Sequence, residues 1–164
     1  MIIEEKNFLT KEEQDFSQTY ILSSRISMHY TRNATDGDDH PILLHILREN
    51  QNHTVVSDLN FFLEDIVKRF AKKHKIKIKK FLRASINVSF SLPQKKSTEH
   101  IDHNFPHYNA IIYLDDCDGD TVIVKDKKIR VKPEKNKVLV FGGYNHYNMY
   151  PKQGRRIIGV VTWQ

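Results

Sequence analysis

The sequence predicts an α+β domain in which N-terminal helices pack on an antiparallel β-sandwich or barrel of the jelly-roll kind. Apolar residues recur at helical spacing in the first half and at strand spacing in the second half. Turns rich in Asp, Gly, Lys and Pro separate the predicted strands. The chain has 164 residues, of which 39% are apolar, so we expect one domain over residues 1–164. We divide it into a helical support region, residues 1–80, and a β core, residues 81–164.

The support region contains two predicted helices separated by a loop. Residues 10–23 open with Thr10 and Glu13 at the spacing of a capping box, and apolar side chains follow at helical steps. Residues 29–41 contain turn-forming residues and few apolar ones, which predicts an exposed loop. Residues 57–74 carry the clearest amphipathic pattern, with Ser57 as the expected cap. We expect the apolar face of this helix to pack on a sheet.

The β core reads as short antiparallel strands. The strand candidates are residues 81–90, 108–114, 121–125, 128–131, 137–141 and 156–163. The Asp-rich segment 115–120 and the segment 132–136 are expected to be turns. No repeat or low-complexity linker divides the chain, which supports a single domain.

Composition argues against several protein classes. The longest apolar runs are far shorter than the roughly 20 residues of a membrane helix, and the N-terminus lacks a secretory pattern. The single cysteine, Cys117, agrees with a reducing compartment, so we expect a cytoplasmic protein. The formal net charge of +6 would attract acidic partners. Nucleic acid is not the favoured partner, because the basic runs are not interleaved with stacking aromatic residues.

Three residues form a candidate metal site. His100 and Asp102 are two positions apart, and a strand would direct both to the same face. His146 follows the predicted strand 137–141 and the pair Gly142-Gly143. Two imidazoles and one carboxylate are the ligand set of non-heme Fe(II) oxygenases, and this set leaves three coordination positions open. The neighbouring His103 should face away from Asp102, as a surface or substrate-side group.

An arginine near the C-terminus is suited to bind a carboxylate. Arg155 and Arg156 stand at the start of the last predicted strand, so they point to opposite faces. Arg156 shares its parity with Ile158 and Val160, which suit the interior. We therefore expect Arg156 to face inward, where its planar fork could hold a dicarboxylate.

Residues 83–163 resemble the catalytic core of the 2-oxoglutarate- and Fe(II)-dependent dioxygenases, and most closely the prolyl 4-hydroxylase-like branch. The matching pieces, in order, are His100-Ile101-Asp102, residues 108–116, residues 119–121, residues 133–141, His146, Pro151 and residues 154–156. The order and spacing of these pieces together carry the resemblance.

The resemblance implies a double-stranded β-helix, a cupin-like jelly roll, that binds Fe(II) through His100, Asp102 and His146. It implies that Arg156, in a Gly-x-Arg pattern, and Tyr113 hold the distal carboxylate of the co-substrate 2-oxoglutarate. Dioxygen would be consumed, and 2-oxoglutarate would be decarboxylated to succinate. The implied function is hydroxylation, with a prolyl residue in a peptide or protein as the expected target.

Two alternatives stay open. The same cofactors could act on a nucleobase, a free amino acid or another small molecule. A peptide substrate predicts a groove with aromatic walls, for which Phe90, Phe105 and Tyr144 are candidates. The non-enzymatic alternative is a jelly-roll binding module with an incidental or structural metal site. A closed zinc site usually needs four ligands, often cysteines, which argues against a structural metal here.

Overall fold

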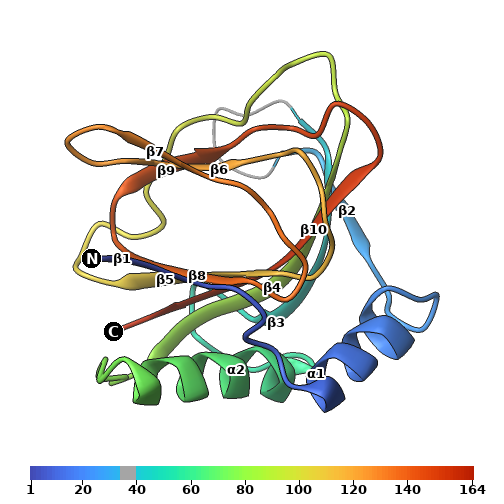
Figure 1. The fold of residues 1–164 in the computed structure, drawn as a ribbon. Helices are drawn as coiled ribbons and strands as arrows, with labels where there is room; N and C mark the ends of the chain where they lie inside the picture. The colour runs from blue at the N-terminus through green and yellow to red at the C-terminus, as the bar shows by residue number, and fades with distance from the viewer. Residues whose placement is uncertain (34–39) are drawn as a thin grey trace.

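A computed structural model describes residues 1–33 and 40–164. Two antiparallel sheets face each other, and the helices lie beneath the larger sheet (Figure 1). The seven strands of the larger sheet follow the order β1-β8-β5-β10-β4-β3-β2, and the smaller sheet has the order β7-β6-β9. This arrangement confirms the predicted α+β jelly roll with helices packed on one sheet.

The strands of the larger sheet come from both halves of the chain. They are β1 (Ile2–Glu5), β2 (His29–Thr31), β3 (Ile42–Arg48), β4 (Phe81–Phe90), β5 (Tyr108–Tyr113), β8 (Val138–Gly142) and β10 (Arg155–Trp163). The smaller sheet contains β6 (Thr121–Val124), β7 (Lys128–Val131) and β9 (Asn145–Asn148). The helical segments are α1 (Lys11–Phe16), the π-helical turn η1 (Ser17–Ile21) and α2 (Asn60–Lys73).

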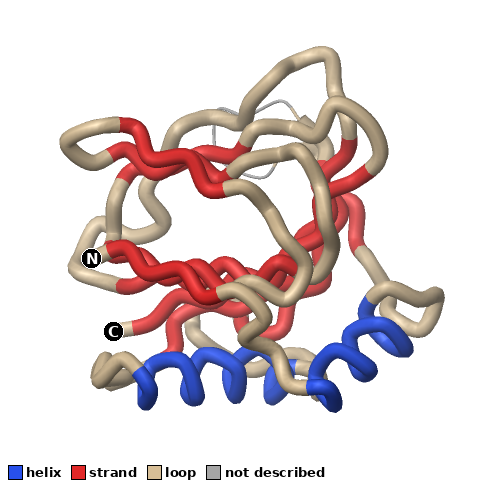
Figure 2. Tube along the Cα trace, viewed as in Figure 1, coloured by secondary structure: helices blue, strands red, loops and turns tan. Residues whose placement is uncertain are grey.

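The helices cover the outer face of the larger sheet (Figure 2). The α2 residues Leu63, Ile66 and Val67 are fully buried in a core shared with that sheet. Gly159 of β10 allows this close approach, since a Cβ atom there would lie 2.5 Å from Leu63 Cδ2. Helix α2 is therefore anchored to the centre of the sheet. None of the helices in the described residues is long and apolar enough to cross a membrane.

A second apolar cluster lies between the two sheets. Its buried members are Ile111, Tyr113, Ile123, Val131, Leu139, Phe141, Ile158 and Val160. Alternation along each strand separates this cluster from the helix-facing core, because successive side chains point to opposite faces of a sheet. The space between the sheets is polar where His146 and Arg156 enter it. The candidate functional site lies in that space.

The predicted elements agree with the structure except in the support region and at β9, which is not among the strand candidates. The six strands predicted after residue 80 are present, and the expected capping box joins Thr10 and Glu13. Calling residues 1–80 helical was wrong in part, because β1, β2 and β3 also lie there and join the larger sheet. Part of the predicted loop 29–41 is strand β2, and residues 34–39 lie outside the described part of the chain. Helix α2 begins at Asn60, with no side-chain cap.

Candidate functional site

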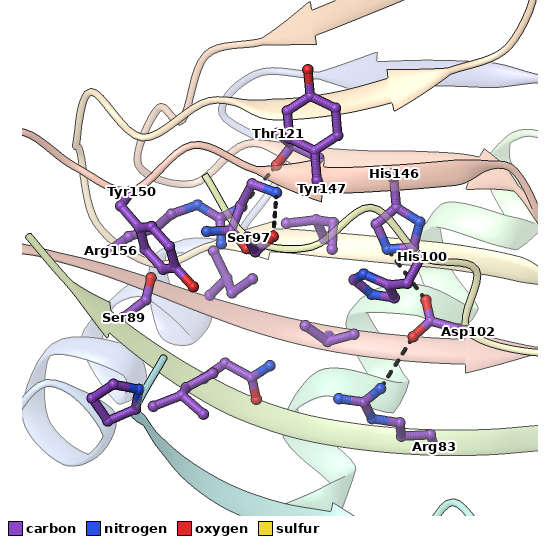
Figure 3. A pocket seen from close by; sticks show the side chains of 17 residues that line it. Arg83, Ser89, Ser97, His100, Asp102, Thr121, His146, Tyr147, Tyr150 and Arg156 are labelled. Atoms are coloured by element: carbon purple, nitrogen blue, oxygen red, sulfur yellow. Dashed lines mark hydrogen bonds and ion pairs between the residues drawn. The ribbon is translucent and has the colours of Figure 1, made fainter. Parts of the chain in front are cut away.

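The fold brings His100, Asp102 and His146 together. One ligand atom from each residue lies within 4.8 Å of the other two (Figure 3). His100 and His146 form an antiparallel bridge in which each backbone N–H donates to the other carbonyl, at 3.0 and 2.8 Å. Strand β9 carries His146, and the segment with His100 continues the smaller sheet beyond that strand. The backbone therefore fixes the separation of the two imidazoles.

Both imidazoles present their Nε2 atoms to the site. His100 Nδ1 lies 3.0 Å from the Thr98 carbonyl, and His146 Nδ1 lies 3.0 Å from the Tyr144 carbonyl. A carbonyl oxygen can only accept, so each Nδ1 carries the proton and each Nε2 keeps its lone pair. This is the tautomer that a metal-binding histidine requires.

Electrostatics favour the ligand forms of these groups. Burial would raise the pKa of Asp102, but Arg83 and the nearby imidazoles outweigh burial and lower that pKa. The Arg83 guanidinium donates to Asp102 Oδ1 at 3.1 Å, which leaves Oδ2 facing His146 Nε2 at 3.4 Å. Burial lowers the pKa of His146, so its imidazole is neutral. An ionised carboxylate and a neutral imidazole are the forms that bind a divalent metal, and the set fits Fe(II).

Arg156 enters the same space from β10. Its side chain is buried, and it donates to the Gly119 carbonyl at 3.0 Å through Nε and to Thr121 Oγ1 at 2.7 Å through Nη2. Burial lowers the pKa of Arg156, yet an arginine keeps its charge in proteins. Arg155 points to the other face, half exposed, at 3.7 Å from Asp115. Alternation along β10 thus directs Arg156 inward, as its parity predicts.

Gly119 makes room for this arginine. A Cβ atom at this position would lie 2.7 Å from the Met149 carbonyl and 3.2 Å from Arg156 Cδ. The first contact is with a backbone carbonyl, and moving the backbone costs more than moving a flexible side chain. A side chain at residue 119 would therefore displace either the backbone or Arg156.

One cavity joins the triad to the arginine. Its volume is about 80 Å³, room for several water molecules, since one water needs roughly 10–15 Å³ measured in this way. Figure 3 shows the triad towards one end and Arg156 towards the other. The lining residues are Pro41, Ile42, Arg83, Asn87, Ser89, Ser97, His100, Asp102, Ile111, Thr121, His146, Tyr147, Asn148, Tyr150, Arg156, Ile158 and Val160. The cavity suits a small anion bound between a metal and a guanidinium.

Several candidates from the sequence lie elsewhere. Tyr113 is fully buried beside the cavity rather than in its lining, and its phenol donates to Thr121 Oγ1 at 2.7 Å. Phe90, Phe105 and Tyr144, the expected walls of a peptide groove, do not line this cavity. The surface expectation for His103 was wrong, because this residue is only 9% exposed and its Nε2 lies 2.9 Å from Thr162 Oγ1.

Sequence reasoning gave no role to several polar residues of the cavity lining, among them Arg83, Asn87, Thr121 and Asn148. Arg83 and Asn87 alternate along β4, while Thr121 and Asn148 are paired across β6 and β9. The alternation of polar residues along β4 was a usable signal, because a half-polar strand beside a predicted site suggests a polar lining. The pairing of Thr121 with Asn148 depends on strand register, which a single sequence does not reveal.

Several solved structures share this fold. An oxidoreductase of the 2OG-Fe(II) oxygenase family from Burkholderia pseudomallei superposes with a TM-score of 0.76 at 12% identity, covering 99% of this chain and 84% of that one. The chain has the fold of the 2OG-Fe(II) oxygenases. No protein-family model and no curated protein matches the sequence.

Two further structures with this oxygenase fold differ in what they act on or bind. A prolyl hydroxylase from Trichoplax adhaerens, in complex with a hypoxia inducible factor peptide fragment, gives a TM-score of 0.67 at 14% identity, covering 99% and 82% of the two chains. The α-ketoglutarate-dependent carbocyclase SnoK from nogalamycin biosynthesis gives 0.73 at 12% identity, covering 99% and 78%. The fold is therefore shared by a protein bound to a peptide and by one from small-molecule biosynthesis.

Proposed function

We propose that the protein is a 2-oxoglutarate- and Fe(II)-dependent dioxygenase that hydroxylates an organic substrate. The observation that carries this proposal is the single cavity holding His100, Asp102 and His146 at one end and Arg156 at the other. Fe(II) and 2-oxoglutarate, when bound, supply activation of dioxygen coupled to decarboxylation of the co-substrate to succinate. The three protein ligands leave three coordination positions, enough for two co-substrate atoms and dioxygen.

The residues of this chain have separable tasks in that reaction. His100 and His146 present their Nε2 atoms because backbone carbonyls hold their Nδ1 protons. Arg83 holds one oxygen of Asp102 and leaves the other for the metal. Arg156 supplies a fixed, buried positive charge for the distal carboxylate of 2-oxoglutarate. The buried surroundings limit water around these groups, which strengthens each electrostatic contact.

We propose a prolyl residue in a peptide or protein as the substrate, supported by the likeness to a prolyl hydroxylase that binds a peptide. The cavity is small, so only the reacting group of a substrate would enter, while the rest would lie outside. A small-molecule substrate is the second candidate. Two observations favour it: the likeness to SnoK, and the absence of the three expected aromatic residues from the cavity lining.

The test is an anaerobic titration of purified, metal-free protein with Fe(II) and then 2-oxoglutarate. A visible charge-transfer band is expected when both are bound, and the His146→Ala variant should lack it. His29→Ala, which removes an exposed histidine from an edge strand, is the matched control and should keep the band. A folded wild-type protein that gives no band would contradict the proposed cofactor chemistry and favour the binding-module alternative.

A further inference from the structure

A groove lies at one end of the larger sheet, where β10 finishes. Its volume is about 720 Å³, against about 80 Å³ for the cavity at the triad. Ligand sites commonly occupy roughly 300–1,000 Å³, so the groove can take part of another molecule. Both chain ends lie on this side in Figure 1. We call it the end groove, and its lining includes Lys77, Lys79, His107, Tyr108, Gly143 and Tyr144.

The end groove lies beyond the triad, on the side opposite Arg156. Arg156 is the second residue of β10, whereas the groove residue Gln164 directly follows this strand. Between them, Thr162 pairs with Arg83 of β4, and Arg83 binds Asp102 at 3.1 Å. The order along the barrel is therefore Arg156, the triad and the end groove. A molecule in the groove faces the metal site from the side that Arg156 leaves free.

Short contacts join the end groove to the triad. Tyr144 lines the groove, and its carbonyl accepts from His146 Nδ1 at 3.0 Å. His107 also lines the groove, and its ring centroid lies 4.8 Å from that of His103, the neighbour of Asp102. Few residues thus separate the groove from two of the proposed metal ligands. A chain bound in the groove needs only a few residues, at about 3.3 Å each, to reach the triad.

Two lysines line the end groove beside β4. Lys77 and Lys79 are exposed, and neither side chain forms an ion pair or hydrogen bond with another described residue. They alternate with Ile76 and Ile78, which pack against the helix-facing core. This alternation holds both ammonium groups on the outward side, towards solvent and the groove. Both charges are therefore available to a ligand.

A third lysine reaches the end groove from the smaller sheet. Lys125 follows β6, and its Nζ lies 5.6 Å from the centre of the Tyr144 ring. Its ion pair with Asp126 is long, at 3.9 Å, and exposed. Figure 1 shows the tip of the β6–β7 hairpin and the end of α2 on opposite sides of this groove. No aspartate or glutamate side chain is among the described residues that line it. The positive field of these lysines attracts an acidic ligand.

The groove surface favours a polypeptide over a nucleic acid. The N–H and C=O groups of Gly143 have no hydrogen-bond partner among the described residues. A polypeptide backbone can both donate to and accept from such groups, whereas a phosphodiester backbone only accepts. Single-stranded nucleic acids bind by stacking on aromatic faces. Here Tyr108 already stacks on Trp163, with ring centroids 5.4 Å apart, and Lys125 covers Tyr144.

We propose that the end groove binds an acidic segment of a polypeptide substrate, with its carboxylates between Lys77 and Lys79 on one side and Lys125 on the other. This inference rests on the proposed function and deepens it, because it places aspartate or glutamate residues beside the residue that reacts. Lysine ammonium groups form charge-assisted hydrogen bonds with carboxylates. The small cavity at the triad then needs to hold only the reacting side chain.

The experiment measures fluorescence anisotropy of labelled peptides mixed with the full-length protein. The probes are octaglutamate, octaglutamine and an oligonucleotide of eight thymidines. Octaglutamate should bind, and its affinity should fall as the salt concentration rises from about 50 to 200 mM. Octaglutamine should bind at least about tenfold more weakly, because it keeps the backbone but loses the charge. The oligonucleotide should bind more weakly than octaglutamate.

Paired substitutions test the position of the site. Lys77→Gln with Lys79→Gln should weaken octaglutamate roughly three- to thirtyfold, the value of two partly exposed ion pairs. Lys11→Gln with Lys152→Gln is the matched control, since it removes the same charge from two exposed lysines outside the groove. The control should stay within about 1.5-fold of wild type.

A spin-labelled probe tests the link to the triad. Octaglutamate that carries a nitroxide at one end is added to protein loaded with Mn(II) and 2-oxoglutarate. The nitroxide signal should broaden, and His146→Ala should remove the broadening without loss of octaglutamate affinity. Octaglutamate that binds without broadening overturns its assignment to the substrate and leaves the groove as a site for a separate partner.

The remaining outcomes distinguish this inference from the proposed function. Absence of octaglutamate binding to wild type, or an equal loss in the control pair, overturns the groove assignment. An oligonucleotide that binds more tightly and loses affinity in the Lys77 and Lys79 variant assigns the groove to nucleic acid instead. Failure of the charge-transfer band in wild type overturns the proposed function, whatever the anisotropy shows. The Lys77 and Lys79 variant should keep that band.

Discussion

Removing the charge of Arg83 should destabilise the metal-free protein and strengthen metal binding. Arg83 Nη1 lies 3.1 Å from Asp102 Oδ1, and the two side chains are 27% and 6% exposed. In Arg83→Leu the carboxylate stays buried but loses its cation. The variant therefore separates the charge of Arg83 from the ligand set itself.

The magnitude follows from the burial of the pair. Breaking a fully buried ion pair from one side costs about 3–5 kcal/mol. Arg83 is partly exposed, so solvent screens the pair and we expect a loss of about 2 kcal/mol in the free energy of unfolding. A divalent metal supplies the missing positive charge, so the metal-bound variant should recover most of that loss. By the thermodynamic cycle, metal affinity then rises roughly thirtyfold.

The assay combines urea unfolding of metal-free protein with calorimetric titration of Mn(II). Arg83→Lys keeps a positive charge and should behave like wild type within about 1 kcal/mol. Arg130→Leu is the matched surface control, because Arg130 bonds Asp120 at 3.0 Å but is 60% exposed. Its effect should be within about 1 kcal/mol, with unchanged Mn(II) affinity.

Two results would refute this reasoning. Unchanged stability and unchanged Mn(II) affinity in Arg83→Leu would mean that the ion pair contributes nothing at this site. Weaker Mn(II) binding would mean that Arg83 orients the carboxylate and that orientation outweighs charge. The dissociation constant for Mn(II) falls if the charge of Arg83 matters, stays the same if the ion pair contributes nothing, and rises if orientation matters more. This one constant therefore distinguishes the three outcomes.

Two glycine substitutions give further predictions. Gly159→Ala should destabilise the protein by about 1–3 kcal/mol, because the new Cβ would lie 2.5 Å from Leu63 Cδ2. In urea unfolding, Leu63→Ala should lower the free energy of unfolding less in the Gly159→Ala variant than in wild type. Additive losses would contradict the steric account. Gly119→Ala should displace Arg156 and weaken 2-oxoglutarate at least tenfold. Mn(II) affinity should not change, and a parallel loss of metal binding would indicate a wider disturbance.

Local patterns in the sequence predicted the parts of the site that depend on neighbouring residues. Arg156 faces inward because strand residues alternate, and parity with Ile158 and Val160 is visible without a structure. The spacing of His100 and Asp102 pointed to one face for the same reason. No local pattern links His146 to the other two residues, so its prediction as a ligand depended on the order of the surrounding motifs.

Contacts across strands were beyond such reasoning. Strand β1 has only four residues, two of them acidic, and it is an edge strand whose partner β8 lies far away in the chain. Four residues are too few to show the alternation of apolar and polar side chains that distinguishes a strand from a loop. The positions of Thr121 and Asn148 in the cavity wall depend equally on register, because a shift of either strand by one residue would turn its side chain away from the cavity.

Strand β9 ties the two ends of the site together. His146 and Asn148 are two residues apart on the same face, so the strand sets their separation at about 6.8 Å. His146 belongs to the proposed metal site, and Asn148 lines the cavity that Arg156 also enters. Pairing with β6 holds this strand on one side, and the bridge to His100 holds it on the other. The backbone of β9 and its two neighbours therefore fixes the spacing of these two positions in the cavity wall.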